Sequence, residues 1–298
     1  MEPAPSFSCD SKKTEASDVS GTLYVVGTPI GNLGDLTPRA RETLAAVAAI
    51  ACEDTRRTGL LLSKHDIANP GMIVTNEHSE RQAAEQVVER LAAGDDVAVV
   101  SDAGMPTISD PGAVVVAAAA GAGFDVVVVP GPSAVSAALA ISGFVAGRFS
   151  FEGFLPRKGR ERGQRLAALA DDDRMLVLYE APHRLERTLA DLSEALGVER
   201  GVVVAHELTK LHESAWRGPL GEAGAAHANP KGEYVIVVDA PPTADPASDE
   251  ELTAELAELL GAGETVKSAS AEVAERHGVA KRRVYDLALA VRNNTHRG

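Results

Sequence analysis

Short apolar runs alternate with amphipathic stretches along the first part of the chain. The apolar runs predict strands at Leu23–Val26, Met72–Val74, Val97–Val100 and Asp125–Val129. Apolar residues at helical spacing between these runs predict helices over Pro38–Ile50, Ser79–Ala93 and Gly112–Ala120. Because each helix returns the chain to the same end of the sheet, this alternation favours a mainly parallel sheet.

The pattern changes after residue 130. Strands predicted at Met175–Tyr179, Val202–His206 and Tyr234–Val238 are interleaved with helices over Arg162–Ala170 and Arg184–Leu196, which indicates a second α/β domain of similar size. A Pro/Ala/Asp-rich linker follows, and then a helix, a glycine turn and a second helix, the form of a helix-turn-helix. The predicted organisation is a disordered leader (1–20), two α/β domains (21–130 and 131–240), a linker (241–249) and a helical module (250–298).

Three predicted strands of the first domain each run directly into a loop rich in Gly and Pro. The loops are GTPIGNLGD (27–35), SDAGMPTISDPG (101–112) and PGPSA (130–134). Glycine adopts backbone angles that other residues avoid, and proline fixes one angle, so such loops are stiff and present bare backbone. Ordinary connecting turns are the alternative. Three such loops at the carboxyl ends of strands favour a small-ligand site.

Composition narrows the classes of protein that the chain can represent. With 45% hydrophobic residues among 298, it is long enough for two domains with cores of their own. We see no membrane-spanning run and no signal-peptide core, so we expect a soluble cytoplasmic protein. Of the two cysteines, Cys52 lies in apolar sequence and we expect it to be buried. The eight histidines show no pair at zinc spacing, so we predict no metal.

The formal charge of −14 argues against general binding of nucleic acid, but a local basic patch acts independently of net charge because salt screens distant charges. Two candidate patches for RNA contact stand out. One surrounds the start of a predicted helix and comprises Arg157, Lys158, Arg160, Arg162 and Arg165. The other lies near the C-terminus and comprises Lys281, Arg282, Arg283, Arg292 and Arg297. A helical hairpin with a solvated basic face explains the second patch equally well.

Common phosphate, hydride and hydrolase motifs are missing from the sequence: it has no GxGxxG, no GxxxxGK[ST] and no GxSxG. Charged groups nevertheless gather in the segments EDTRRT, FEGFLPRK, YEAPHR and ELTK. Each segment alone is equally consistent with a cap or a surface ion pair, but together they favour a cleft between two α/β halves. His78 stands at a predicted helix start, where a capping role is favoured over catalysis.

Eight segments, in their order along the chain, resemble the ribosomal RNA small subunit methyltransferase I family of the tetrapyrrole methylase superfamily. They are GTPIGNLGD, EDTRRT, SDAGMPTISDPG, VPGPSA, FEGFLPRKG, YEAPHR, ELTK and KGEYVIVV. The resemblance implies two α/β domains with S-adenosylmethionine in the cleft between them, a small C-terminal helical module and a homodimer. It also implies methyl transfer to the ribose 2′-hydroxyl of a decoding-region cytidine in 16S rRNA of the 30S subunit. The cofactor positions that it implies are Pro29, Ser101, Asp102, Ala103, Ser133 and Ala134 and, less securely, Glu180 and Leu208.

Methyl transfer from a sulfonium releases a neutral thioether, so alignment of the reactants is the main requirement and supplies about 7–11 kcal/mol. The ribose hydroxyl is a weak acid and needs a proton acceptor. Our candidates are Glu180 as acceptor, with Glu152 close behind, and Lys158 or Lys210 as electrostatic partner. We assign RNA contacts to Arg157, Lys158, Arg160, Arg184, Lys281, Arg282 and Arg283, with Arg184 holding a phosphate. A small-molecule methylase acting on a tetrapyrrole precursor and a non-catalytic nucleic-acid-binding protein are the alternatives.

Overall fold

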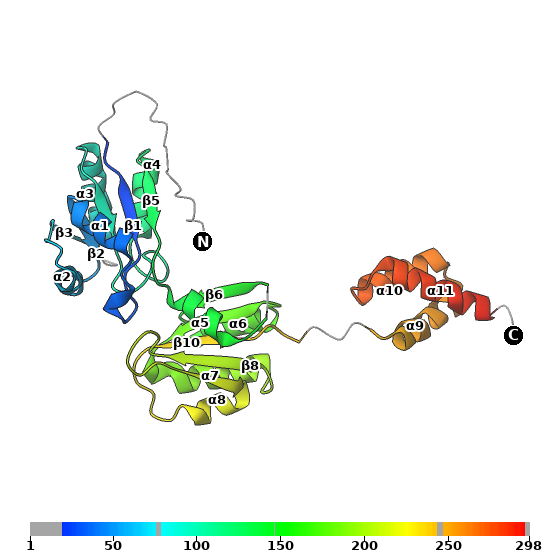
Figure 1. Ribbon diagram of the computed structural model, residues 1–298. Helices are drawn as coiled ribbons and strands as arrows, with labels where there is room; N and C mark the ends of the chain where they lie inside the picture. The colour runs from blue at the N-terminus through cyan, green and yellow to red at the C-terminus, as the bar shows by residue number, and fades with distance from the viewer. Residues whose placement is uncertain (1–19, 76–78, 146, 243–246, 296–298) are drawn as a thin grey trace, which may run out of the picture. The chain divides into compact units, whose positions relative to one another are not determined.

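A computed structural model describes residues 20–75, 79–145, 147–242 and 247–295 of the chain (Figure 1). The chain divides into two compact units, one ending at Ala240 and one beginning at Pro241. The first unit holds two five-stranded sheets, and the second consists of helices. The predicted disordered leader and His78 fall outside the described residues, apart from the last leader position, Ser20.

The first sheet is parallel throughout, with the strand order β3-β2-β4-β1-β5, so the prediction of a mainly parallel sheet is confirmed. In its centre, Leu23 of β1 is in register with Val97 of β4 and Val126 of β5. The strands are β1 (Leu23–Val26), β2 (Ala49–Cys52), β3 (Met72–Val74), β4 (Val97–Val99) and β5 (Val126–Val129).

Helices cover both faces of this sheet because successive side chains of each strand point to opposite sides. Val97 and Val99 pack with helices α3 (Glu80–Ala92) and α4 (Ala113–Gly121). Ala98, between them, packs with α1 (Pro38–Ala46) and α2 (Thr55–Lys64). Burial on both faces accounts for strands that are almost wholly apolar.

The predicted helix Pro38–Ile50 is wrong at its C-terminal end. Helix α1 stops at Ala46, and residues Ala49–Cys52 form the buried strand β2 between β3 and β4. A short apolar run does not reveal by periodicity whether it is helix or strand, so the strand was merged with the helix before it. The EDTRRT segment after β2 also belongs to a helix, since Asp54 caps α2 by accepting a hydrogen bond from the Arg56 amide.

The second sheet is mixed, with the strand order β6-β7-β10-β8-β9. Only β6 and β7 are parallel, whereas β10 is antiparallel to both β7 and β8. The strands are β6 (Phe149–Gly153), β7 (Met175–Glu180), β8 (Gly201–His206), β9 (Ser214–Pro219) and β10 (Tyr234–Val238). The edge strands β6 and β9 were not predicted, because polar and glycine residues interrupt their apolar pattern.

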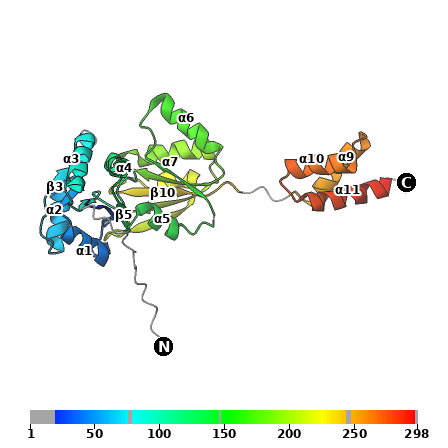
Figure 2. The ribbon, with the colours of Figure 1, turned by 90° about the horizontal axis from the view of Figure 1, so that it is seen from above.

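Different helices pack on the two faces of the second sheet (Figure 2). Leu176 and Leu178 of β7 face a core shared with α6 (Gly159–Ala170), α7 (Pro182–Leu196) and α8 (Leu220–Ala226). Val177, between them, faces α5 (Ala134–Ser142) on the other side. Helix α5 therefore connects the third Gly/Pro loop to the core of the second sheet.

Three helices form the second unit around a core of their own: α9 (Asp249–Gly261), α10 (Val266–Arg276) and α11 (Lys281–Thr295). Ser248 and Glu251 form a capping box at the start of α9. The predicted helix, glycine turn and helix correspond to α10, Gly278 with φ +61° and α11. In the part of the chain that the structure describes, no helix is long and apolar enough to cross a membrane.

Candidate active site

The first and third Gly/Pro loops touch each other through their glycines. The Gly27 amide donates to the carbonyl oxygen of Val129 at 3.0 Å. A Cβ atom on Gly27 would lie 2.7 Å from the backbone of Gly131, and one on Gly131 would lie 2.8 Å from the Gly27 oxygen. Only glycine at both positions permits this approach, because backbone on either side has no room to move.

The second loop is joined to the first by a pair of backbone hydrogen bonds. The Thr28 amide donates to Gly104 at 2.9 Å and the Gly104 amide donates back at 3.1 Å. The Ser101 hydroxyl also donates to the Gly104 oxygen, and both Thr28 and Ser101 are buried. Gly104 has φ +91°, a conformation that favours glycine. The three loops therefore form one rigid backbone assembly at the carboxyl ends of β1, β4 and β5.

A cavity of about 310 Å³ lies between this loop assembly and the end of the second sheet. Its volume is within the range of small-molecule sites. We call it the loop cavity. Its walls are mainly apolar and come from Ile30, Ala103, Gly104, Met105, Ile108, Ser109, Asp110, Ser133, Ala134, Phe154, Tyr179, Glu180, Ala181, Pro182, Leu208, Gly232, Glu233, Tyr234 and Val235.

Of the predicted cofactor positions, Ala103, Ser133, Ala134 and Leu208 line the loop cavity directly. Pro29 and Ser101 are buried and do not belong to its lining. Asp102 is turned elsewhere, since its carboxylate accepts from the Asp54 amide at 3.2 Å and lies 3.5 Å from Arg57. Asp102 thus ties the second loop to α2.

One acidic residue of the loop cavity, Asp110, was not among the predicted site residues. Among the described residues, no hydrogen bond or ion pair neutralises its carboxylate. Burial, together with the nearby charges of Glu53 and Asp102, raises the pKa of Asp110 to about 6. Burial and the charge of Asp110 in turn raise the pKa of Tyr179, another wall residue, to about 12. The SDPG sequence at the end of the second loop was the available signal for this residue.

Glu180, the predicted proton acceptor, contributes to the wall, but its side chain is buried and fully engaged. Its carboxylate accepts from the Ala181 amide at 2.8 Å and from the Thr188 hydroxyl at 2.5 Å. Arg184 lies 3.2 Å away as an ion-pair partner. This saturation favours a structural role for the carboxylate over proton transfer.

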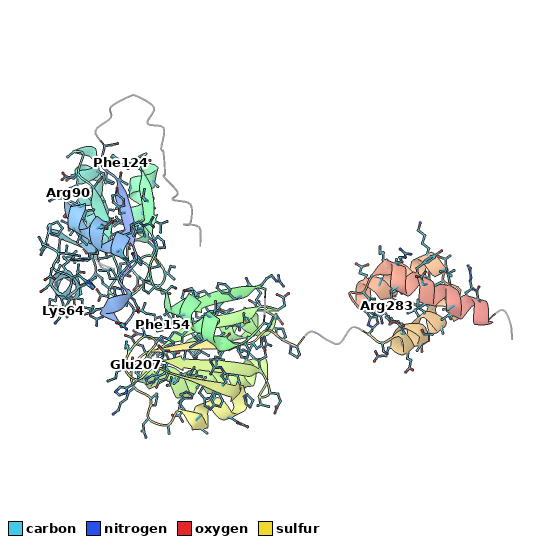
Figure 3. All side chains as sticks on the ribbon, viewed as in Figure 1. Lys64, Arg90, Phe124, Phe154, Glu207 and Arg283 are labelled. Carbon is cyan, nitrogen blue, oxygen red and sulfur yellow. The ribbon has the colours of Figure 1, made fainter. Side chains whose placement is uncertain are left out.

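Lys210, a predicted electrostatic partner, is neutralised by two carboxylates. Its ammonium group lies 2.8 Å from Glu207, labelled in Figure 3, and 2.9 Å from Glu233. Its side chain packs so closely on Gly31 that a Cβ atom there would lie 2.4 Å from it. Lys210 therefore fastens the ELTK segment to the first loop.

The remaining predicted side chains lie away from the loop cavity's wall. Glu152, the second candidate for proton acceptor, is hydrogen-bonded to Ser150 and paired with Arg165 on β6 and α6. Lys158 is exposed at the start of α6, next to Arg157 and Arg160. Arg184 donates to the Leu155 carbonyl and reaches a second, basic cavity, which Arg157 also lines.

In the helical module, Arg283 (Figure 3) is tied to the start of α9. It donates to Asp249 at 2.7 Å and to the Ala247 carbonyl at 3.1 Å. Lys281 and Arg282, in the first turn of α11, are exposed and have no partner among the described residues. Cys52 is buried and free, and the part of the chain that the structure describes holds no cluster of three or more candidate metal ligands.

Comparison with protein families identifies the fold. The family described as Tetrapyrrole (Corrin/Porphyrin) Methylases matches residues 22–224, which include both sheets up to β9 and α8. The chain belongs to the tetrapyrrole methylase family. A second family model, described as the RsmI C-terminal HTH domain, matches residues 246–292 of the chain. Together the two matches confirm the expected fold class of two α/β domains and a helical module.

Curated relatives place the chain within one branch of the tetrapyrrole methylases. A Synechocystis protein named Ribosomal RNA small subunit methyltransferase I is 48% identical over 273 residues, 90% of this chain and 98% of that protein. A Thermotoga maritima protein of the same name is 46% identical over 221 residues, which cover 73% of this chain and 98% of that shorter protein. The resemblance to the ribosomal RNA small subunit methyltransferase I family is thereby confirmed.

A solved tetrapyrrole methylase has the same fold at low sequence identity. It is the uroporphyrin-III C-methyl transferase from Thermus thermophilus complexed with S-adenyl homocysteine, with a TM-score of 0.54 and 16% identity. The alignment covers 74% of this chain and 97% of that one. At this identity the likeness establishes the fold alone.

Proposed function

We propose that the chain transfers a methyl group from S-adenosylmethionine to ribosomal RNA. The acceptor that we assign is the ribose 2′-hydroxyl of a decoding-region cytidine in 16S rRNA of the small subunit. The observation that carries this proposal is the loop cavity, built from the Gly/Pro loops of a chain whose relatives are named ribosomal RNA small subunit methyltransferase I. A cytoplasmic homodimer, implied by the family resemblance, is part of the proposal.

The loop cavity fits S-adenosylmethionine in size and chemistry. Its apolar walls suit an adenine ring and a thioether, and the close contact of Gly27 with Gly131 keeps two of its backbone loops in fixed positions. Ala103, Ser133, Ala134 and Leu208 would contact the cofactor, whereas Pro29, Ser101 and Asp102 would hold the loops in shape. When bound, the cofactor supplies a methyl group activated by a positively charged sulfur.

The start of α5 offers further recognition for a polar group of the cofactor. Ser133 is the N-cap residue, and its side chain makes no capping hydrogen bond to the described helix. Unpaired amide groups at a helix start attract negative charge, such as the carboxylate of an amino acid. Because Ser133 and Ala134 also line the loop cavity, these amides are available to a ligand there.

Asp110 is our candidate for the proton acceptor in place of Glu180. It is an unpaired carboxylate in the wall of the loop cavity, and its pKa of about 6 lies near working pH. A base of that strength is ionised at neutral pH and takes up a proton more readily than an ordinary carboxylate. Neither Lys158 nor Lys210 is required for this step, since one lies outside the lining and the other is neutralised.

RNA contacts are assigned to basic residues in both units. Arg157, Lys158 and Arg160 are exposed around the start of α6, Arg184 is partly buried and lines the basic cavity together with Arg157, and Lys281 and Arg282 lie on the helical module. Arg283 is left as a structural residue because its guanidinium group already binds Asp249. The Thermotoga relative is too short to hold a counterpart of the helical module beside the methylase fold, so we assign the module an auxiliary role.

The test is transfer of tritiated methyl from S-adenosylmethionine to 30S subunits purified from a strain that lacks the protein. We expect label in 16S rRNA, and nuclease mapping should place it on one ribose in the decoding region. A catalytically inactive control is the Asp110→Asn variant, which should bind the cofactor but transfer little label. Cofactor binding without any label on RNA would instead favour a small-molecule methylase, and no cofactor binding would favour a non-catalytic nucleic-acid-binding protein.

A further inference from the structure

A second cavity, of about 340 Å³, opens beside α7. We call it the basic cavity. Five of its lining side chains are arginine or histidine, namely Arg157, Arg162, His183, Arg184 and Arg187, and the sixth is Thr188. Guanidinium groups gathered in one cavity create a local positive potential that attracts anions, even in a chain with a formal net charge of −14.

The floor of the basic cavity is built from buried side chains. The Arg162 side chain is only 4% exposed and donates to Asp191 at 2.6 Å, to the Pro156 carbonyl at 2.9 Å and to the Thr188 hydroxyl at 2.9 Å. Thr188 is also buried, and it passes the chain of hydrogen bonds on to Glu180. The floor is thus fixed by hydrogen bonds rather than free to collapse.

Positive charge remains in excess after the internal ion pairs are counted. Four arginines line the cavity, and the carboxylates that pair with them are those of Asp191 and Glu180. Arg187 is 62% exposed and its pairing with Asp191 is loose, at 3.7 Å. Arg157 is exposed and has no partner among the described residues. Two guanidinium groups at the mouth are therefore available to bind an anion.

The basic cavity shares a wall with the loop cavity. Pro182 lines the loop cavity and His183, the next residue, lines the basic one. Glu180 and Arg184, one from each lining, lie 3.2 Å apart. The two cavities are therefore neighbours on either side of the Glu180–Arg184 pair.

We propose that the basic cavity binds a backbone phosphate of the RNA substrate, adjacent to the ribose that is methylated. This inference rests on the proposed function of the loop cavity. Planar guanidinium groups bind phosphate oxygens in pairs, and Arg157 and Arg187 supply two at the mouth. Arg184 positions this wall, held by Glu180 and the Leu155 carbonyl, while Arg162 and Thr188 form its rigid base.

The test compares the wild-type chain with the double variant Arg157→Ala/Arg187→Ala. Both side chains are exposed, so the fold should persist, as circular dichroism and an unchanged Kd for S-adenosylmethionine will show. The matched control is Lys64→Ala/Arg81→Ala, which removes two exposed cations from α2 and α3 of the first half. Methyl transfer to 30S subunits is measured at several salt concentrations for all three proteins.

We expect the Arg157/Arg187 variant to raise the KM for 30S subunits about 10- to 100-fold, the loss expected for charge-assisted hydrogen bonds. The slope of log KM against log salt should also fall by about 0.7 for the lost phosphate contact, a change that a purely structural role does not produce. The control variant should leave both quantities within about twofold of wild type.

Three results separate the outcomes. An unchanged KM and salt slope in the Arg157/Arg187 variant, with wild-type activity intact, would overturn the phosphate site and leave the proposed function standing. Binding of millimolar inorganic phosphate that is lost in the Arg157/Arg187 variant but leaves the wild-type KM for 30S subunits unchanged would also overturn it, because the cavity would then hold a free anion instead of RNA. Failure of the wild-type chain to methylate RNA would refute the proposed function itself.

Discussion

The loops that leave the first sheet and the charged residues that flank the second are stabilised by different kinds of interaction. The loops are held by backbone contacts, such as the approach of Gly27 to Gly131 and the paired hydrogen bonds of Thr28 and Gly104. The second region is held by side chains, in a network that links Asp191 through Arg162 to Glu180. The difference is that backbone fixes the shape of the loops and side chains fix the network, and under our proposals the loops hold the cofactor while the network supports the anion site.

Exchange of single carboxylates provides the sharpest test of this division. Asp110→Asn should lower kcat about 10²- to 10⁴-fold, because it removes the unpaired base of the loop cavity. Glu180→Gln should lower kcat less than about tenfold, because that carboxylate already has three partners. Single-turnover rates with saturating cofactor measure both. A larger loss for Glu180→Gln would reverse the division and restore Glu180 as the proton acceptor.

Removal of the central arginine should damage stability more than chemistry. Arg162→Met deletes a buried guanidinium group and leaves Asp191 without its closest partner and the Thr188 hydroxyl without its donor. Breaking such a pair costs about 3–5 kcal/mol in the free energy of unfolding. Urea denaturation measures the loss, and Arg160→Met, at an exposed position two residues away, is the control with little expected effect. Equal stability of the two variants would contradict a structural role for the network.

A single methyl group should separate the first and third loops. Gly131→Ala places a Cβ atom 2.8 Å from the Gly27 oxygen, so we expect about 1–3 kcal/mol of destabilisation and at least about tenfold weaker cofactor binding. Gly163→Ala, on α6 with open space around it, is the matched control and should be neutral or slightly stabilising. Calorimetric titration with S-adenosylmethionine measures the Kd of both variants and of the wild type. Unchanged affinity for Gly131→Ala would mean that the loop contact does not shape the site.

The raised pKa of Asp110 predicts a pH-dependent stability. Because the folded protein holds this proton up to a pKa of about 6, against an ordinary value of 3.8, the carboxyl group lowers the free energy of unfolding as the pH rises across that interval. Asp110→Asn removes this loss. The variant should melt a few degrees above wild type at pH 8 and no higher at pH 4, a modest effect because solvent screens the group. Equal Tm values at pH 8 would mean that the pKa is not raised.

Features fixed by the backbone could be predicted from the sequence, and features fixed by side-chain partners could not. Glycine and proline mark loops directly, so the sequence predicted the three loops, and three positions that the family resemblance implied, Ala103, Ser133 and Ala134, line the loop cavity. The strand Ala49–Cys52 was missed because its four residues are apolar on both faces and continue the pattern of the preceding helix. In a parallel sheet this loss of alternation is the usual consequence of double-sided burial.

The partners of charged residues could not be predicted for a related reason. Glu180, Lys210 and Glu152 have the chemistry of site residues and lie at or near strand ends, but in the fold each has an ion-pair partner: Arg184, Glu233 and Arg165, respectively. A sequence pattern records the type of a side chain and not its partner. Asp110 shows the opposite case. Its sequence context is typical of a turn, but in the fold its unpaired carboxylate lines the loop cavity.

The position of β10 in the second sheet has a consequence for biosynthesis. This strand is the last of the methylase fold to be made, yet it lies in the middle of its sheet, between β7 and β8. Until Tyr234–Val238 leaves the ribosome, the pairs β6-β7 and β8-β9 each present an open inner edge, the kind of edge that invites wrong partners. Tyr234 and Val235 also complete the wall of the loop cavity. A nascent chain therefore gains its binding site and loses its exposed edges in the same late event.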